Sequence, residues 1–165
     1  MAEAPQPGPV HTTAGYGIGD APADGSVLPW SRVVDWLTAA RNYWVCTTRA
    51  DGRPHAMPVW GIWLDGAFFF GSGRESAKSR NLAANPAIVV HLESGDETVI
   101  LDGRAEPVLD DALERRVDEA YGLKYDFTPD SSGESDPWFV VRPQRVYAWI
   151  EGSYPGSATQ FDFDH

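Results

Sequence analysis

The sequence predicts a mainly β protein with flanking helices, in which an antiparallel sheet closes toward a split β-barrel. Short runs rich in Val, Ile, Phe and Trp follow one another between residues 43 and 108. Short turns between them carry the pairs Asp51-Gly52, Asp65-Gly66 and Gly95-Asp96. Such turns form antiparallel hairpins, because a parallel crossover needs a dozen or more residues. Helical patterns flank the runs, and the antiparallel order excludes a Rossmann domain.

The expected helices each combine a capping residue with an apolar stripe. The first begins near Pro29, with Ser31 as its N-cap, and the second covers residues 110–125, with Asp110 or Asp111 as its cap. Their stripes consist of Val33, Val34, Leu37 and Ala40 in the first helix and of Leu113, Val117, Ala120 and Tyr121 in the second. We expect strands at residues 43–49, 55–64, 67–72, 87–93 and 98–108, and one or two more over 138–152, interrupted at Pro143.

The chain of 165 residues is long enough for one domain with a real core, which we place at residues 28–165. Residues 1–27 are rich in Pro, Gly and Ala and are expected to form a mobile tail. The single Cys46 rules out an internal disulfide, and the absence of a His/Cys cluster predicts no metal site. Without a secretory signal or an apolar run of about 20 residues, a cytoplasmic protein is expected.

The charge of the chain is unevenly distributed. The formal net charge is -11, but residues 29–104 carry eight acidic and eight basic residues, so the excess of acid lies at the two ends. An acidic surface of this kind repels nucleic acid and anionic membranes, and neither is expected as a partner. The neutral central block can still accept an anionic small molecule.

A group of basic residues stands out in the stretch "FFFGSGRESAKSRNLAANP", where Arg74, Lys78 and Arg80 fall within seven residues. A short helix is expected from Ser76 to Asn85, ended by Pro86. The unpaired N–H groups and the dipole at a helix start favour an anion, so this segment predicts a phosphate site. The alternative is an ordinary surface helix with solvated basic side chains.

The expected strand at residues 55–64 is apolar on both faces. A single antiparallel sheet normally leaves one face in water, so a partner subunit, a planar cofactor or both are expected to cover the second face. Pro58 cannot donate to a strand ladder and Gly61 permits close backbone approach, which suits a place where a ring edge meets the backbone. The alternative is a thick barrel core that binds no ligand.

Several motifs occur together in "TRADGRPHAMPVWGIWLDGAFFFGSGRESAKSRNLAANPAIVVHL". They are a G-x-P-x-x-x-P-V-W strand, a D-G hairpin, an S-x-K-x-x-N-L helix and an N-P before the next strand. Over residues 31–108 this combination resembles the pyridoxamine 5'-phosphate oxidase-like, flavin-binding split-barrel superfamily. The P-V-W form is similar to the actinobacterial branch that uses the deazaflavin coenzyme F420. That branch often ends in an A-T-R-W-x-F-like motif, whereas this chain has "ATQFDF", with Gln160 at the usually basic position.

The resemblance implies a set of site residues. Lys78 and Ser76 would bind the phosphate with support from Arg80 and Asn81. The ring system would lie against Pro58, Val59 and Trp60 at the interface of a homodimer. As walls for cofactor or substrate, the aromatic and imidazole side chains of the strands are candidates: His55, Trp63 and Tyr43, together with Trp60. No catalytic proton donor is identified.

The resemblance therefore implies an oxidoreductase that binds coenzyme F420 and transfers hydride to a small, planar, electron-poor substrate. Hydride transfer needs no protein nucleophile, because the protein supplies orientation and electrostatics. Two alternatives remain open at this point. One is an FMN-binding member of the same fold, and the other is a carrier that binds a cofactor or haem without turnover.

Overall fold

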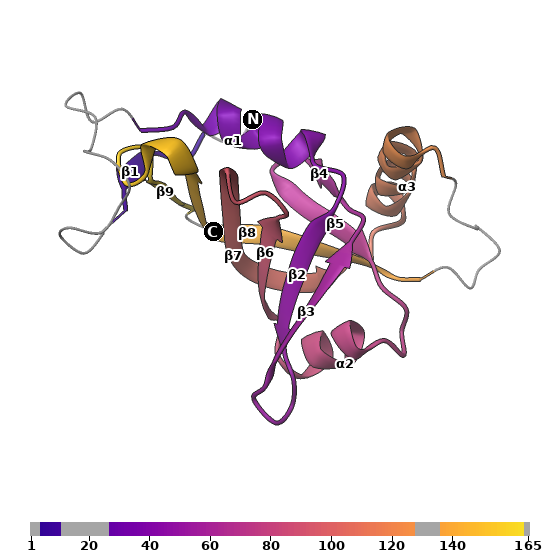
Figure 1. Cartoon of the computed structure of the whole chain (residues 1–165). Coiled ribbons are helices and arrows are strands. Elements are labelled where there is room, and N and C mark those ends of the chain that lie inside the picture. Colours follow the sequence, from indigo (N-terminus) through magenta and orange to yellow (C-terminus); the bar gives the residue numbers. More distant parts are fainter. Residues whose placement is uncertain (1–3, 11–26, 128–135, 164–165) are drawn as a thin grey trace.

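A single antiparallel sheet with three α-helices around it forms the body of the protein (Figure 1). The computed structural model describes residues 4–10, 27–127 and 136–163. The helices are α1 (Trp30–Ala39), α2 (Ala77–Ala84) and α3 (Asp111–Tyr125), with a 3-10 turn at Glu151–Ser153. The strands are β1 (Pro7–Pro9), β2 (Tyr43–Thr48), β3 (Pro54–Val59), β4 (Ile62–Leu64), β5 (Ala67–Gly71), β6 (Ala87–Leu92), β7 (Glu97–Pro107), β8 (Trp138–Ile150) and β9 (Thr159–Asp162).

The long strand β8 connects the two parts of the sheet. The main path runs β1-β9-β8-β7-β6-β2-β3, and β5 pairs with the first part of β8 while β4 pairs with β5. All of these pairings are antiparallel, which confirms the predicted mainly β, antiparallel class. Among the described strands, β3 and β4 do not pair, so hydrogen bonds do not close a complete barrel. The edge of β3 remains open.

The hairpins predicted at Asp51-Gly52 and Asp65-Gly66 are present in the structure. Asp65 and Gly66 have φ of 50° and 79° between β4 and β5, as a two-residue hairpin with both central residues at positive φ requires. Gly52 has φ of 83° between β2 and β3. Asp110 caps α3 by accepting a hydrogen bond from the Leu113 N–H at 2.7 Å.

Three local predictions were wrong. Ser31 lies inside α1, whose N-cap is Pro29 without a side-chain bond, so the helix starts two residues earlier than predicted. The strand expected at 55–64 is interrupted after Val59, so β3 and β4 are separate. Conversely, β8 continues through Pro143, and the irregularity appears as a shift in its register with β7 between Asp102 and Gly103.

The N-terminal segment differs in part from the expected structureless tail. Pro7–Pro9 forms a short strand that pairs with β9, with Gly8 opposite Gln160. Prolines are compatible with an edge strand because they lack only the N–H, and the free edge of β9 offers a ladder to complete. Residues 11–26 lie outside the described residues, so the expectation of mobility is not addressed for them.

The helices cover different parts of the sheet, with α1 and α2 at opposite ends in Figure 1. The main core includes Val33 and Leu37 of α1 and Leu82 of α2. A second core joins α3, through Val117, to β4, β5 and β8. The predicted apolar stripes of both longer helices therefore face the sheet. Among the described residues, no helix is both long and apolar enough to cross a membrane.

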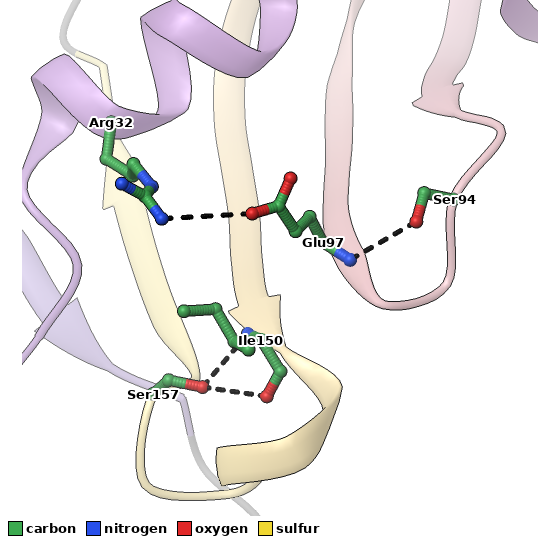
Figure 2. Close-up of polar contacts among 5 residues, drawn as sticks. All are labelled: Arg32, Ser94, Glu97, Ile150 and Ser157. Carbon is green, nitrogen blue, oxygen red and sulfur yellow. Dashed lines mark hydrogen bonds and ion pairs between the residues drawn. The ribbon is translucent and has the colours of Figure 1, made fainter.

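Polar contacts hold α1 against the end of the sheet (Figure 2). The Arg32 guanidinium lies 3.8 Å from the Glu97 carboxylate at the start of β7. The Glu97 N–H in turn donates to the Ser94 hydroxyl at 3.3 Å, which orders the β6–β7 turn. Nearby, the Ser157 hydroxyl accepts from the Ile150 N–H at 3.0 Å and donates to its carbonyl at 3.1 Å. This end of the sheet is thus well ordered.

Candidate functional site

The start of α2 is built from three serines. Ser76 is the N-cap, and its hydroxyl accepts a hydrogen bond from the Ser79 N–H at 3.1 Å. The hydroxyls of Ser72 and Ser76 lie 2.8 Å apart, and the Ser79 hydroxyl donates to the Gly73 carbonyl at 2.8 Å. The predicted helix start is confirmed. The Ser76 hydroxyl already has protein partners, so its first task is to hold the loop at residues 72–76 on the helix.

Two basic side chains bring positive charge to the region beside the loop at residues 72–76. Lys78 in α2 and Arg49 in the β2–β3 turn are both close enough to His55 for their charges to act on it. Burial, and then the charges of Arg49 and Lys78, lower the pKa of His55. Neither Arg49 nor Lys78 has a carboxylate within 4 Å among the described residues. The sequence prediction missed Arg49, because it lies 29 positions from Lys78 and only the fold brings them together.

A buried polar chain connects His55 to α2. The Asn81 side-chain amide donates to the Thr47 hydroxyl at 2.9 Å, and this hydroxyl lies 3.3 Å from His55 Nδ1. The Thr47 hydroxyl thus links the Asn81 amide to the His55 imidazole, and the tautomer of His55 sets which of Thr47 and Nδ1 is the donor. Asn81 is buried and acts through Thr47. His55 therefore belongs to the α2 end of β3.

The other two cations of the "GRESAKSR" segment point elsewhere. Arg80 donates to the backbone carbonyl of Glu75, which holds its guanidinium against the preceding loop. Arg74 is exposed. Of the three predicted cations, Lys78 is the half-buried one that faces His55, while Arg80 supports the loop and lies at its rim.

The open edge strand β3 runs from this cation group toward α3. Its side chains are unusually exposed for a strand so apolar: Met57 is 44% exposed and Trp60, just after the strand, is 38% exposed. Pro58 is also exposed, and Val59 is half-buried. In this chain alone, β3 is therefore an uncovered apolar edge. The expected cover by a partner subunit, a planar cofactor or both therefore stays a prediction.

Gly61, which follows Trp60, is buried against the neighbouring strand. A Cβ there would lie 2.5 Å from the Phe68 ring and 2.7 Å from the Phe69 carbonyl oxygen. The predicted close backbone approach at Gly61 is thus confirmed. Its partner is β5 rather than a ligand, and the tight contact sets where the chain leaves β3.

A compact aromatic group lies at the Trp60 end of β3. The rings of Trp60 and Tyr125 are parallel within 6° with centroids 4.6 Å apart. The Arg41 guanidinium lies 5.2 Å from the Trp60 ring centroid and 5.8 Å from that of Tyr125. The Tyr125 hydroxyl is 2.8 Å from the Gly61 carbonyl oxygen and accepts from the Gly61 N–H at 3.0 Å. We call Arg41, Trp60 and Tyr125 the aromatic stack.

Lys124 lies directly below this stack. Its amine donates to the Tyr43 hydroxyl at 2.7 Å and to the Gly61 carbonyl at 3.1 Å. Burial lowers the pKa of Lys124 to about 8, since no carboxylate lies within 4 Å among the described residues. Sequence analysis placed this lysine only on a helix. In the sequence, the one indication that Lys124 belongs to the site is its position between Tyr121 and Tyr125, which share a helix face.

Two predicted wall residues do not line an open surface. Tyr43 is 0% exposed, packs against Phe68 with ring centroids 4.6 Å apart and donates to the Leu37 carbonyl. Trp63 is half-buried and meets Trp30 edge-on at 6.0 Å. Both belong to the main core, because alternation along β2 and β4 turns them inward. Trp60, outside either strand, stays at the surface.

The residues thus form a site with two ends along one open edge. His55 and Trp60 are five positions apart, so the cation group and the aromatic stack are separated by roughly 16 Å. One end carries unpaired positive charge beside a helix start, and the other carries a flat indole. This arrangement suits an elongated ligand with an anionic group at one end and a planar ring at the other. The described residues hold no group of three or more potential metal ligands.

Residues 30–150 match the family model described as "Pyridoxamine 5'-phosphate oxidase". A curated pyridoxine/pyridoxamine 5'-phosphate oxidase of Pseudomonas entomophila is 32% identical over 110 residues, which is 64% of this chain and 41% of that protein. The chain therefore matches about two fifths of that relative's length.

Solved structures share the fold. A conserved hypothetical protein of Mycobacterium tuberculosis is 22% identical with a TM-score of 0.68, over 82% of this chain and 92% of that chain. A structure described as an F420 reductase is 24% identical with a TM-score of 0.56, over 68% of this chain and 93% of that chain. At such identities the likeness shows the fold alone.

Proposed function

Because this chain belongs to the pyridoxamine 5'-phosphate oxidase family, we propose that it is an oxidoreductase that binds coenzyme F420 along β3 and passes hydride to a small, planar, electron-poor substrate. The observation that carries the proposal is the open edge of β3, with unpaired cations at one end and the aromatic stack at the other. The P-V-W sequence of this strand favours the deazaflavin over FMN.

The α2 end fits a phosphate. Lys78 and Arg49 have no carboxylate partners among the described residues, so their charges are available to an anion. The first N–H groups of α2 and the helix dipole add to this field. Asn81 and Thr47 would orient His55, while Ser76 would hold the loop in place. FMN offers its terminal phosphate to the same cations and remains the second candidate.

The chemistry of the proposed site needs little from the protein beyond placement. When bound, the deazaflavin supplies the hydride. Pro58 and Val59 would lie along its ring system and keep water from that face, with the Trp60 indole at the end of the ring system. Trp60 can offer an apolar surface to a planar acceptor, and its orientation is fixed by stacking on Tyr125.

A second copy of the chain is the proposed cover for this edge. On the outer face of the sheet, Pro58, Trp44, His91, Ile100 and Tyr147 lie opposite one another across five neighbouring strands. We call them the outer row. Pro58 is exposed and the other four are half-buried, and the Trp44 and His91 rings are parallel within 7°. An apolar row of this extent beside an open strand edge fits an isologous interface.

Cofactor titration tests the proposal. Purified protein is examined by absorbance and then titrated by calorimetry with F420, FMN and haem. Tightest binding of F420, followed by reduction of an electron-poor acceptor by the reduced coenzyme, is the expected result. Tighter binding of FMN would favour the second candidate. Binding of haem alone would indicate a carrier, and binding of none would contradict a cofactor site at β3.

A further inference from the structure

The guanidinium of Arg41 is placed on aromatic rings but paired with no acid. Arg41 follows α1, and its backbone carbonyl accepts a hydrogen bond from the Tyr125 hydroxyl at 2.7 Å. Its Cζ lies within 6 Å of the ring centroids of both Trp60 and Tyr125. Among the described residues, no carboxylate lies within 4 Å of it. Its backbone is therefore fixed while its N–H donors remain available.

Arg32, which lies inside α1, shows what is unusual about Arg41. Arg32 also lies over a tryptophan, 5.4 Å from the Trp36 ring centroid, but its guanidinium is paired with Glu97 (Figure 2). Stacking on an indole is therefore common to both arginines. Only Arg41 combines it with free donors and a place beside the proposed cofactor strand.

The surroundings of Arg41 limit where an anion could lie. A cleft of about 280 Å³ begins at Arg41, between the end of α1 and the β6–β7 turn. Its lining includes the carboxylates of Glu93 and Glu97, which would repel an anion deep in the cleft. Glu93 is held by the Asn42 amide at 3.0 Å, and Glu97 by Arg32. Trp60 does not line this cleft, and its ring centroid lies 5.2 Å from the Arg41 guanidinium, so an anion on the Trp60 side of Arg41 would avoid both carboxylates.

We propose that Arg41 is the residue that selects an acidic substrate, by binding the carboxylate of a planar, conjugated acid whose ring lies on Trp60. The inference rests on the proposed function and names the substrate class of that site. Arg41 lies by Trp60 and Lys78 acts on His55, and these two positions of the β3 segment are five residues or roughly 16 Å apart, so one phosphate is not expected to engage both cations. A planar fork of donors beside an indole recognises a carboxylate and an aromatic ring together.

A matched pair of probes tests the inference. The planar acid 4-nitrocinnamate and its neutral amide 4-nitrocinnamamide share the ring and the electron-poor double bond and differ in charge. Their dissociation constants are measured by ligand-observed NMR with wild-type protein, Arg41→Gln and the control Arg32→Gln, each with and without bound cofactor. Wild type is expected to prefer the acid by about 10-fold, Arg41→Gln to lose this preference, and Arg32→Gln to keep it.

The outcomes separate this inference from the proposed function. If Arg41→Gln keeps the preference, if Arg32→Gln loses it equally, or if wild type binds neither probe or shows no preference, the role of Arg41 is wrong even where cofactor binds normally. If no cofactor binds while Arg41 still sets the preference in cofactor-free protein, the proposed function falls and the acid site stands. Circular dichroism checks that each variant is folded.

Discussion

The amine of Lys124 in α3 lies 3.1 Å from the carbonyl oxygen of Gly61, at the point where the chain passes from β3 to β4. The same amine donates to Tyr43, and the hydroxyl of the adjacent Tyr125 accepts from the Gly61 N–H. These residues come from α3, β2 and the β3–β4 junction, and Tyr125, on which the exposed Trp60 stacks, is one of them. A half-buried lysine thus lies beside the residue that supports Trp60.

Replacement of Lys124 by Met is expected to change how stability depends on pH. Burial lowers the pKa of Lys124 to about 8 from an ordinary value of 10.5, so between these values the unfolded chain binds more protons than the folded one. The free energy of unfolding therefore gains a contribution from this group as pH rises through that window, and loses it as pH falls through about 8. Lys124→Met should lack this contribution.

Urea unfolding of both proteins from pH 7 to 10 checks the effect of Lys124. The difference between wild type and Lys124→Met isolates the lysine, because the tyrosines are common to both. Burial raises the pKa of Tyr43 and Tyr125, so deprotonation of these phenols opposes the trend only at higher pH. A difference that does not vary with pH would show that Lys124 does not titrate in this range.

Replacement of Gly61 by Ala is expected to destabilise the fold by about 1–3 kcal/mol. The added methyl would lie 2.5 Å from the Phe68 ring and 2.7 Å from a backbone oxygen that cannot move aside easily. Gly95→Ala is the matched control, because a Cβ there meets nothing within 4 Å. Denaturant unfolding compares the two, and equal stabilities would argue against tight packing at the β3–β4 junction.

Replacement of Lys78 by Ala is expected to weaken cofactor binding by about 10- to 150-fold, because a charge-assisted contact to the phosphate would be lost. Arg80→Ala should cost less, since the Arg80 guanidinium is held by the Glu75 carbonyl. Arg116→Ala serves as a control, because Arg116 pairs with Asp65 away from α2. Calorimetry at rising salt should show weakening affinity for wild type. Unchanged binding by Lys78→Ala would overturn the phosphate assignment.

Replacement of Trp44 by Asp is expected to disrupt the proposed homodimer, because it would bury an unpaired charge in the outer row. Leu123→Asp is the control, since this leucine is 83% exposed on α3 and lies outside that row. Sedimentation velocity at micromolar concentration should give a dimer for wild type and the control, and a monomer for Trp44→Asp. A stable wild-type monomer would contradict the interface.

The sequence by itself determined the features that depend on neighbouring residues. The Asp65-Gly66 turn, the cap at Ser76 and the stripe of α3 follow from backbone conformation and periodicity, which are local properties. The motif around Lys78 also indicated the family that the comparison identifies. Where an immediate neighbour overrode the pattern, as Pro29 did with the predicted cap, the prediction was wrong by one or two residues.

Only the tertiary structure decided which side chains meet at the site. Lys124 reaches Tyr43 across 81 positions, and Arg49 joins Lys78 because the β2–β3 turn ends beside α2. The same packing buried Tyr43, the first residue of β2, and left Trp60, just after β3, exposed. The physical reason is that burial and desolvation depend on what packs around a group. The groups that pack around a side chain come from segments distant in the sequence, so a local sequence pattern does not reveal them.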